Sequence, residues 1–120
     1  RVLADMPCSA TGVLGRRPDV RWRRAPDQLP GLVARQKTLL ERAFEQLRPG
    51  GVLVYSTCSL ESEENAAVVD DFLKRTPTAR LELATDSFPD RSWAGRFIQT
   101  IPGHHPGDGS FAARIRKAKS

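Results

Sequence analysis

Apolar residues in the first half of the chain form two continuous runs separated by a stretch with helical spacing. Residues 2–4 are apolar, and residues 52–55 (VLVY) continue without polar alternation. Such a run is typical of a strand that is covered on both faces, as in a parallel sheet. From residue 32 to residue 47, the side chains of one stripe recur every three or four positions, which predicts an amphipathic helix. The RPGG segment at 48–51 ends this helix, because a proline and two glycines cannot continue it.

The second half of the chain predicts another helix and several strands. The helix opens at Ser62, and its apolar stripe comprises Val68, Val69, Phe72 and Leu73. The acidic residues around its start suit the helix dipole and are interpreted as helix-start charges: Glu61, Glu63 and Glu64. Short strands are predicted at 81–83, around 97–101 and at 111–115, and the basic tail from 114 to 120 is expected to fray. This order of elements predicts an α/β sheet with right-handed crossovers.

Length and composition indicate one soluble globular domain. The chain has 120 residues, of which 39% are hydrophobic and 28% are charged. Since no apolar run approaches the roughly 20 residues of a membrane span, we expect no membrane partner and a cytoplasmic location. The net charge of +5 favours a polyanionic partner such as RNA or DNA. Because Arg1 leads directly into an apolar run, we expect the chain to be a fragment of a longer domain.

Each of the two cysteines follows directly on a predicted strand. Cys8 lies in LADMPCSATG, residues 3–12, and Cys58 lies in VLVYSTCSL, residues 52–60. Two cysteines do not make a disulfide framework, so both are expected to be free thiols. The carboxyl ends of neighbouring parallel strands lie about 4.8 Å apart at one edge of a sheet. We therefore expect both thiols and Asp5 at one cleft, where a thiolate can attack C6 of a pyrimidine and make C5 able to accept a methyl group.

Other interpretations of these residues remain open at this point. A cysteine can be a small buried hydrophobic residue, and Asp5 can cap the turn that follows it. A zinc site is not predicted, because His104 and His105 are adjacent and the cysteines lack ligand spacing. The loop after Cys8 is either a solvated basic loop or a surface that binds RNA through its guanidinium and indole groups: Arg16, Arg17, Arg21, Trp22, Arg23 and Arg24.

Two motifs, DMPCSATG at 5–12 and YSTCSLESEEN at 55–65, resemble the two cysteine motifs of the RNA cytosine-5 methyltransferases of the Sun (Fmu) type. The similarity extends to RRPDVRWRR, LRPGGVLVYSTCS and PGDGSFAARI, and is greatest for the bacterial small-subunit rRNA branch. It implies a Rossmann-like S-adenosylmethionine-dependent methyltransferase fold, with a mostly parallel sheet and an antiparallel final strand. In the family's strand order 3-2-1-4-5-7-6, residues 1–120 correspond to strands 4 to 7, the C-terminal half of the catalytic domain. The donor-binding N-terminal half and any RNA-binding domain are absent from this stretch.

The resemblance also assigns roles to individual residues. It implies that Cys58 is the nucleophile that attacks C6 of the target cytosine, and that Cys8 helps to release the methylated RNA, as or with the base that removes the C5 proton. Asp5 is expected to contact the methyl donor and the target base, and Pro7 to shape the turn at the donor site. The implied cofactor is S-adenosylmethionine, whose main binding motif is missing from this chain. The implied partner is RNA, most of all ribosomal RNA.

Two alternative functions are compatible with parts of the sequence. A DNA cytosine-5 methyltransferase uses the cysteine of a Pro-Cys step as its nucleophile, which here is Cys8, but the cysteine motif at the second strand end argues against this assignment. A non-catalytic basic RNA-binding module is the other alternative, and the intact Cys8, Cys58 and Asp5 argue against it.

The resemblance also carries expectations about the isolated chain. We expect it to be inactive, and its first strand to be an open edge that pairs with another copy, whereas the whole protein is expected to be monomeric. Two departures from the family pattern are a methionine at 6 in place of alanine and a serine at 110 in place of an aromatic residue.

Overall fold

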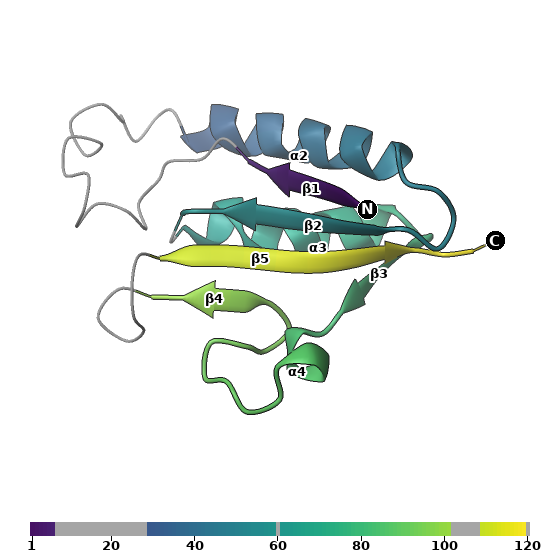
Figure 1. Cartoon of the computed structure of the whole chain (residues 1–120). Coiled ribbons are helices and arrows are strands. Elements are labelled where there is room, and N and C mark those ends of the chain that lie inside the picture. The colour runs from purple at the N-terminus through teal and green to yellow at the C-terminus, as the bar shows by residue number, and fades with distance from the viewer. Residues whose placement is uncertain (7–28, 60, 102–108, 120) are drawn as a thin grey trace.

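The structure is a computed structural model of the chain, and it describes residues 1–6, 29–59, 61–101 and 109–119. The described elements are shown in Figure 1 and follow one another as β1 (Val2–Asp5), α2 (Leu29–Glu45), β2 (Val52–Thr57), the 3₁₀ turn η3 (Ser62–Glu64), α3 (Ala66–Arg75), β3 (Ala79–Glu82), α4 (Ala84–Ser87), β4 (Ile98–Thr100) and β5 (Ser110–Lys117). None of the helices in these ranges combines the length and apolar character that crossing a membrane requires.

All of these strands belong to one mixed sheet. Their order is β1-β2-β5-β3, and β4 also pairs with β5. β1 is parallel to β2, whereas β5 is antiparallel to β2, β3 and β4, so β5 alone among the described strands runs in the opposite direction. This arrangement confirms the predicted α/β fold with an antiparallel final strand. The order also matches strands 4-5-7-6 of the family's sheet.

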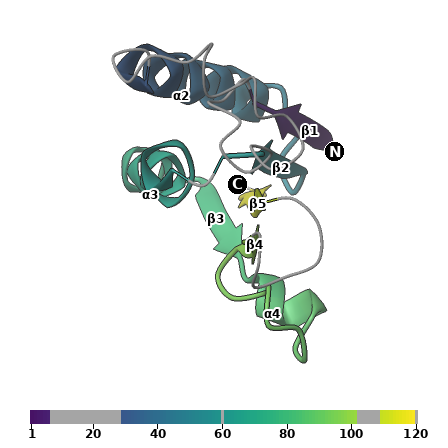
Figure 2. The same cartoon turned by 90° about the vertical axis from the view of Figure 1, so that its left-hand side faces the viewer.

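Both long helices pack on the same face of the sheet, as Figure 2 shows. Alternate residues of β2 and β5 point into this layer, because side chains of a strand alternate between its faces. Phe44 of α2 meets Phe72 of α3 edge to face, with ring centroids 5.1 Å apart. The buried cluster comprises Ala4, Met6, Leu40, Phe44, Leu47, Leu53, Tyr55, Val68, Val69, Phe72, Phe111, Ala113 and Ile115.

α2 begins and ends near the predicted positions. Pro30 lies in its first turn, where a missing N–H leaves no helical hydrogen bond unmade. The helix ends at Glu45, and Leu47 is buried just beyond it. Gly50 has a φ of +83°, which side-chain-bearing residues rarely adopt. A Cβ at Gly51 would lie 2.9 Å from the carbonyl oxygen of Arg48, so the sharp turn into β2 requires this glycine.

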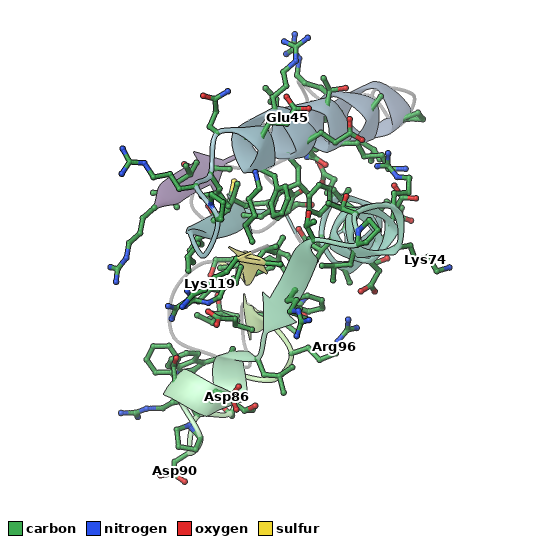
Figure 3. All side chains as sticks on the ribbon, turned by 90° about the vertical axis from the view of Figure 1, so that its right-hand side faces the viewer. Glu45, Lys74, Asp86, Asp90, Arg96 and Lys119 are labelled. Carbon is green, nitrogen blue, oxygen red and sulfur yellow. The ribbon has the colours of Figure 1, made fainter. Side chains whose placement is uncertain are left out.

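The segment between β3 and β4 differs from the prediction. Leu83 was expected in a strand, but it precedes the short helix α4 and is exposed. The Ala84 and Thr85 N–H groups donate to the carbonyls of Arg96 and Gly95. These hydrogen bonds join the two ends of the segment. Its far part, where Figure 3 labels Asp86 and Asp90, projects away from the sheet. A helix of four residues is too short to leave a periodic pattern in the sequence, which is why it was missed.

The prediction that residues 114–120 fray is wrong for residues 114–117, which form the second half of β5. The Arg116 guanidinium donates to Glu82 Oε2 at 2.7 Å and to the Gly50 carbonyl at 2.8 Å. Lys117 Nζ donates to the Leu47 carbonyl at 3.0 Å. The basic side chains therefore fasten the end of the sheet to the turn that follows α2.

The ion pair between Glu82 and Arg116 predicts a pH-dependent contribution to stability. The hydrogen bonds from Arg116 hold the pKa of the Glu82 carboxyl below its usual value of 4.5. A carboxyl whose pKa is lowered by folding stabilises the fold above its unfolded pKa, and this contribution is lost as the pH falls through the folded pKa. Because Glu82 is about a third exposed, we expect Glu82→Gln to cost at most about 1 kcal/mol at pH 7, and nothing once Glu82 is protonated.

Amide hydrogen exchange of residues 114–117, corrected for intrinsic rates, measures this contribution at pH 7 and at pH 3. A matched control is Glu41→Gln, which removes a carboxylate from a more exposed ion pair with Arg75 on the helical layer. Glu41→Gln is expected to leave exchange in β5 unchanged. An equal effect of Glu82→Gln at both pH values would show that the stabilisation does not come from the ion pair with Arg116.

Candidate active site

Asp5 ends β1 and presents its carboxylate at the carboxyl edge of the sheet. It pairs in register with Ser56 of β2, and Ser56 Oγ donates to Asp5 Oδ1 at 3.2 Å. The Met6 N–H donates to the Ser56 carbonyl at 2.9 Å, so the two strands stay paired to this point. Ala4 and Met6 are buried against α2, whereas Asp5 is exposed. The carboxylate therefore faces away from the helical layer and is accessible to a ligand.

β1 and β2 end at the same edge of the sheet (Figure 1). Cys58 follows directly on Thr57, the last residue of β2. Asp5 pairs with the residue two positions before it. Cys58 is partly exposed, while its neighbours Thr57 and Ser59 are 3% and 1% exposed. We refer to residues 57–59 as the Cys58 turn. The partly accessible thiol thus stands between two buried residues.

Hydrogen bonds from one pair of side chains hold both neighbours of Cys58. Thr57 Oγ1 donates to Asn65 Oδ1 at 2.5 Å, and Asn65 Nδ2 donates to the Ser59 carbonyl at 2.9 Å. Ser59 Oγ donates to Glu64 Oε2 and accepts a hydrogen bond from the Glu61 N–H. The Ser59 N–H donates to Thr57 Oγ1 at 3.2 Å. Glu64 and Asn65 therefore bond to both neighbours of Cys58, at the Thr57 and Ser59 side chains and at the Ser59 carbonyl.

Glu64 lies at a helix start, as predicted, but it is fully buried, which the sequence did not indicate. The chain forms the 3₁₀ turn η3 before α3 begins at Ala66, and this turn directs Glu64 inward. Gln36 Nε2 of α2 donates to Glu64 Oε1 at 3.1 Å, and Tyr55 Oη donates to the Glu64 carbonyl at 2.5 Å. The signal that could have revealed this contact is Gln36, a polar residue within the apolar stripe of its helix.

Several predicted site residues lie outside the described residues: Pro7, Cys8, Arg16, Arg17, Arg21, Trp22, Arg23 and Arg24. His104 and His105, at which no zinc site was predicted, lie outside them as well. The structure therefore places Asp5 and Cys58 and does not test the juxtaposition of Cys8 with them. Within the described ranges, no group of His, Cys, Asp or Glu residues is arranged to hold a metal ion. Ser110, which departs from the family pattern, lies with its Oγ 2.8 Å from Thr100 Oγ1, so a hydrogen bond joins β4 and β5 there.

A family model gives the decisive comparison. The model of the 16S rRNA methyltransferase RsmB/F family matches residues 1–116. The chain belongs to the RsmB/F family. The Sun-type resemblance of its two cysteine motifs is thereby confirmed.

Known members and solved structures agree with this RsmB/F assignment. The chain is 43% identical over 117 residues to the ribosomal RNA small subunit methyltransferase B of Vibrio cholerae, a match that covers 98% of the chain and 25% of that protein. The crystal structure of PH0851 superposes with a TM-score of 0.85 at 34% identity, over 96% of the chain and 26% of that structure. The crystal structure of NSun6 from Pyrococcus horikoshii with SFG gives a TM-score of 0.76 at 31% identity, over 98% of the chain and 30% of that structure. The chain spans about a quarter of the length of the curated relatives it matches.

Proposed function

We propose that the protein containing this chain methylates C5 of a cytosine in ribosomal RNA, and that Cys58 is the nucleophile. The observation that carries the proposal is the placement of Asp5 and Cys58 at the ends of two paired parallel strands, with Cys58 a partly exposed residue between two buried ones. Membership of a family described as 16S rRNA methyltransferases supports ribosomal RNA as the substrate. The small-subunit methyltransferase B of Vibrio cholerae supports it further.

The chemistry of Cys58 follows from the electron demand of the pyrimidine ring. The thiolate donates an electron pair to C6 and forms a C–S bond, and the electrons of the C5–C6 double bond move to C5. S-Adenosylmethionine, when bound, supplies the methyl group that C5 accepts. A base then removes the C5 proton, the electrons of the C–H bond re-form the double bond, and the C6–S bond breaks to return the Cys58 thiolate. In this proposal Cys8 acts as or with that base.

Asp5 fits the two polar contacts that the reaction requires at this edge. Its exposed carboxylate accepts hydrogen bonds, and suitable donors are the amino group of the target cytosine and the ammonium group of the methyl donor. SFG, the analogue of S-adenosylmethionine found with NSun6 of Pyrococcus horikoshii, supports this type of cofactor. Pro7 is assigned to the same part of the site, where it shapes the turn after Asp5.

In the proposed whole protein, residues 1–120 form the C-terminal half of the catalytic domain, and the donor loop belongs to the other half. The quarter-length match to relatives and the strand order β1-β2-β5-β3 support this division. The isolated chain is then inactive, and β1 is an edge whose Leu3 is 72% exposed and available to pair with another copy. The whole protein is monomeric and cytoplasmic in this proposal, and the basic residues from Arg16 to Arg24 hold the phosphates that flank the target.

Product analysis tests the proposal directly. The full-length gene product that carries this sequence is incubated with small-subunit ribosomal RNA and S-adenosylmethionine, and the RNA is digested to nucleosides for mass spectrometry. We expect 5-methylcytidine as the product. Methylation of a cytosine or adenine amino group instead would overturn the assignment to C5, and methylation of DNA in preference to RNA would overturn the substrate class.

A further inference from the structure

The residue pair Glu64–Asn65 occupies a buried position behind the Cys58 turn, where the sequence suggested only a helix start. Glu64 is 0% exposed and Asn65 is 2% exposed. We propose that these two residues are positioning residues that set the orientation of the Cys58 nucleophile without contacting the substrate. The inference rests on the proposed function, since it concerns the reaction of Cys58 with RNA.

The chemical nature of the pair argues for a role beyond packing. Burying a carboxylate and an amide is unfavourable unless their hydrogen bonds are made, and apolar residues fill a core position at lower cost. Among its contacts, the Glu64 carboxylate accepts hydrogen bonds from the Gln36 and Ser59 side chains. A buried carboxylate and amide at these positions make sense if their task is to hold Thr57 and Ser59 in a defined place.

The end points of these hydrogen bonds show that the pair holds the two neighbours of Cys58. Asn65 bonds to Thr57 through its Oδ1 and to the Ser59 carbonyl through its Nδ2. Glu64 accepts from Ser59 Oγ through its Oε2. These bonds end on the residues before and after Cys58, two at side-chain hydroxyls and one at the Ser59 carbonyl, so they restrain the turn that carries the Cys58 side chain.

Glu64 is in turn held by hydrogen bonds from two regular elements, the strand β2 and the helix α2. Tyr55 of β2 donates to the Glu64 carbonyl, and Gln36 of α2 donates to the Glu64 carboxylate. Tyr55 and Gln36 are both fully buried. The position of the thiol is thus set relative to the sheet and to α2. A nucleophile held in this way retains its attack geometry, and a displacement of about 1 Å can cost about 100-fold in rate.

Isosteric substitutions test the role with little change in volume. In Glu64→Gln one carboxylate oxygen becomes an NH₂ group, which is a donor only, so the acceptor of one of the two hydrogen bonds is lost. In Asn65→Asp the donor to the Ser59 carbonyl is lost. We measure single-turnover formation of the covalent adduct between the full-length gene product and an RNA that carries 5-fluorocytidine at the methylated position, in the presence of S-adenosylmethionine. The adduct persists because C5 then bears fluorine in place of the proton that must leave.

Each variant is expected to slow adduct formation by about 10- to 100-fold, while RNA affinity stays within about twofold of wild type. The control is Phe72→Leu, which alters a buried contact with Phe44 two turns further along α3. It is expected to lower the unfolding temperature with adduct formation within about threefold of wild type. Unchanged adduct formation in Glu64→Gln and Asn65→Asp, or an equal loss in Phe72→Leu, would overturn the positioning role.

The failure of the proposed function gives a different result. If the wild-type protein forms no adduct, the covalent mechanism fails, and alkylation of Cys58 by iodoacetamide, followed by mass spectrometry, decides the positioning role alone. A change of several-fold in the alkylation rate in Glu64→Gln and Asn65→Asp, but not in Phe72→Leu, supports control of the thiol by the buried pair. Equal alkylation rates in all the proteins would overturn it.

Discussion

Replacing Cys58 by alanine is expected to lower methyl transfer to RNA by at least about 1,000-fold, because the proposed mechanism begins with addition of the Cys58 thiolate to the base. In this account C5 of cytosine accepts a methyl group only after the thiolate has added to C6. The measurement is single-turnover transfer of labelled methyl from S-adenosylmethionine to small-subunit ribosomal RNA by the full-length gene product.

The control for Cys58→Ala is RNA affinity, which is expected to remain within about twofold of wild type. The hydrogen bonds that hold the turn involve the side chains of Thr57 and Ser59, and these remain in the variant. Cys58→Ser is a second comparison, because it keeps the size of the side chain but replaces the thiolate by a much weaker nucleophile. Retention of a tenth or more of the wild-type rate in either variant would show that Cys58 is not the nucleophile.

Replacing Asp5 by asparagine is expected to lower kcat/KM for RNA by about 100- to 1,000-fold. The substitution keeps the shape of the side chain but removes the negative charge at the end of β1, where the proposal places an ammonium group and the target base. The loss of one charged or hydrogen-bonding group that stabilises the reacting centre typically has this size. Steady-state kinetics with saturating S-adenosylmethionine and varied RNA measure it.

Ser56→Ala provides the matched control for Asp5→Asn. Ser56 Oγ donates to Asp5 Oδ1 at 3.2 Å on an exposed surface, so its removal is expected to change kcat/KM by less than about fivefold. If Asp5→Asn and Ser56→Ala have equally small effects, the carboxylate has no direct part in the reaction. It would then serve only as an exposed polar end of β1.

The sheet was predictable to the extent that its strands are continuous and apolar. The run at 52–55 and the alternation at 111–115 identified β2 and β5. A strand buried on both faces has a continuous apolar sequence, and a strand buried on one face has alternating apolar residues. The basic end of β5 was not predictable, since Arg116 and Lys117 look like a solvated tail until the chain brings Glu82 and the end of α2 beside them. Pairings that depend on distant partners leave no local pattern.

In the candidate site, too, contacts between residues that are distant in the sequence could not be predicted. Asp5 and Cys58 could be proposed from the sequence because each lies at the end of an apolar run and in a motif that resembles a known family. Glu64 was predicted only as a charge at a helix start, where an acidic residue suits the helix dipole, and its burial was not foreseen. Its burial depends on the 3₁₀ turn and on Gln36, which lies 28 positions away in the sequence.

The covalent adduct with RNA tests the central claim most directly. The full-length gene product, as wild type, Cys8→Ala and Cys58→Ala, is incubated with small-subunit ribosomal RNA and S-adenosylmethionine, and protein–RNA adducts that survive denaturation are measured on gels. The account predicts that the adduct accumulates in Cys8→Ala, where release is slow, and is absent in Cys58→Ala. Accumulation in Cys58→Ala and absence in Cys8→Ala would contradict it, because Cys8 would then be the nucleophile.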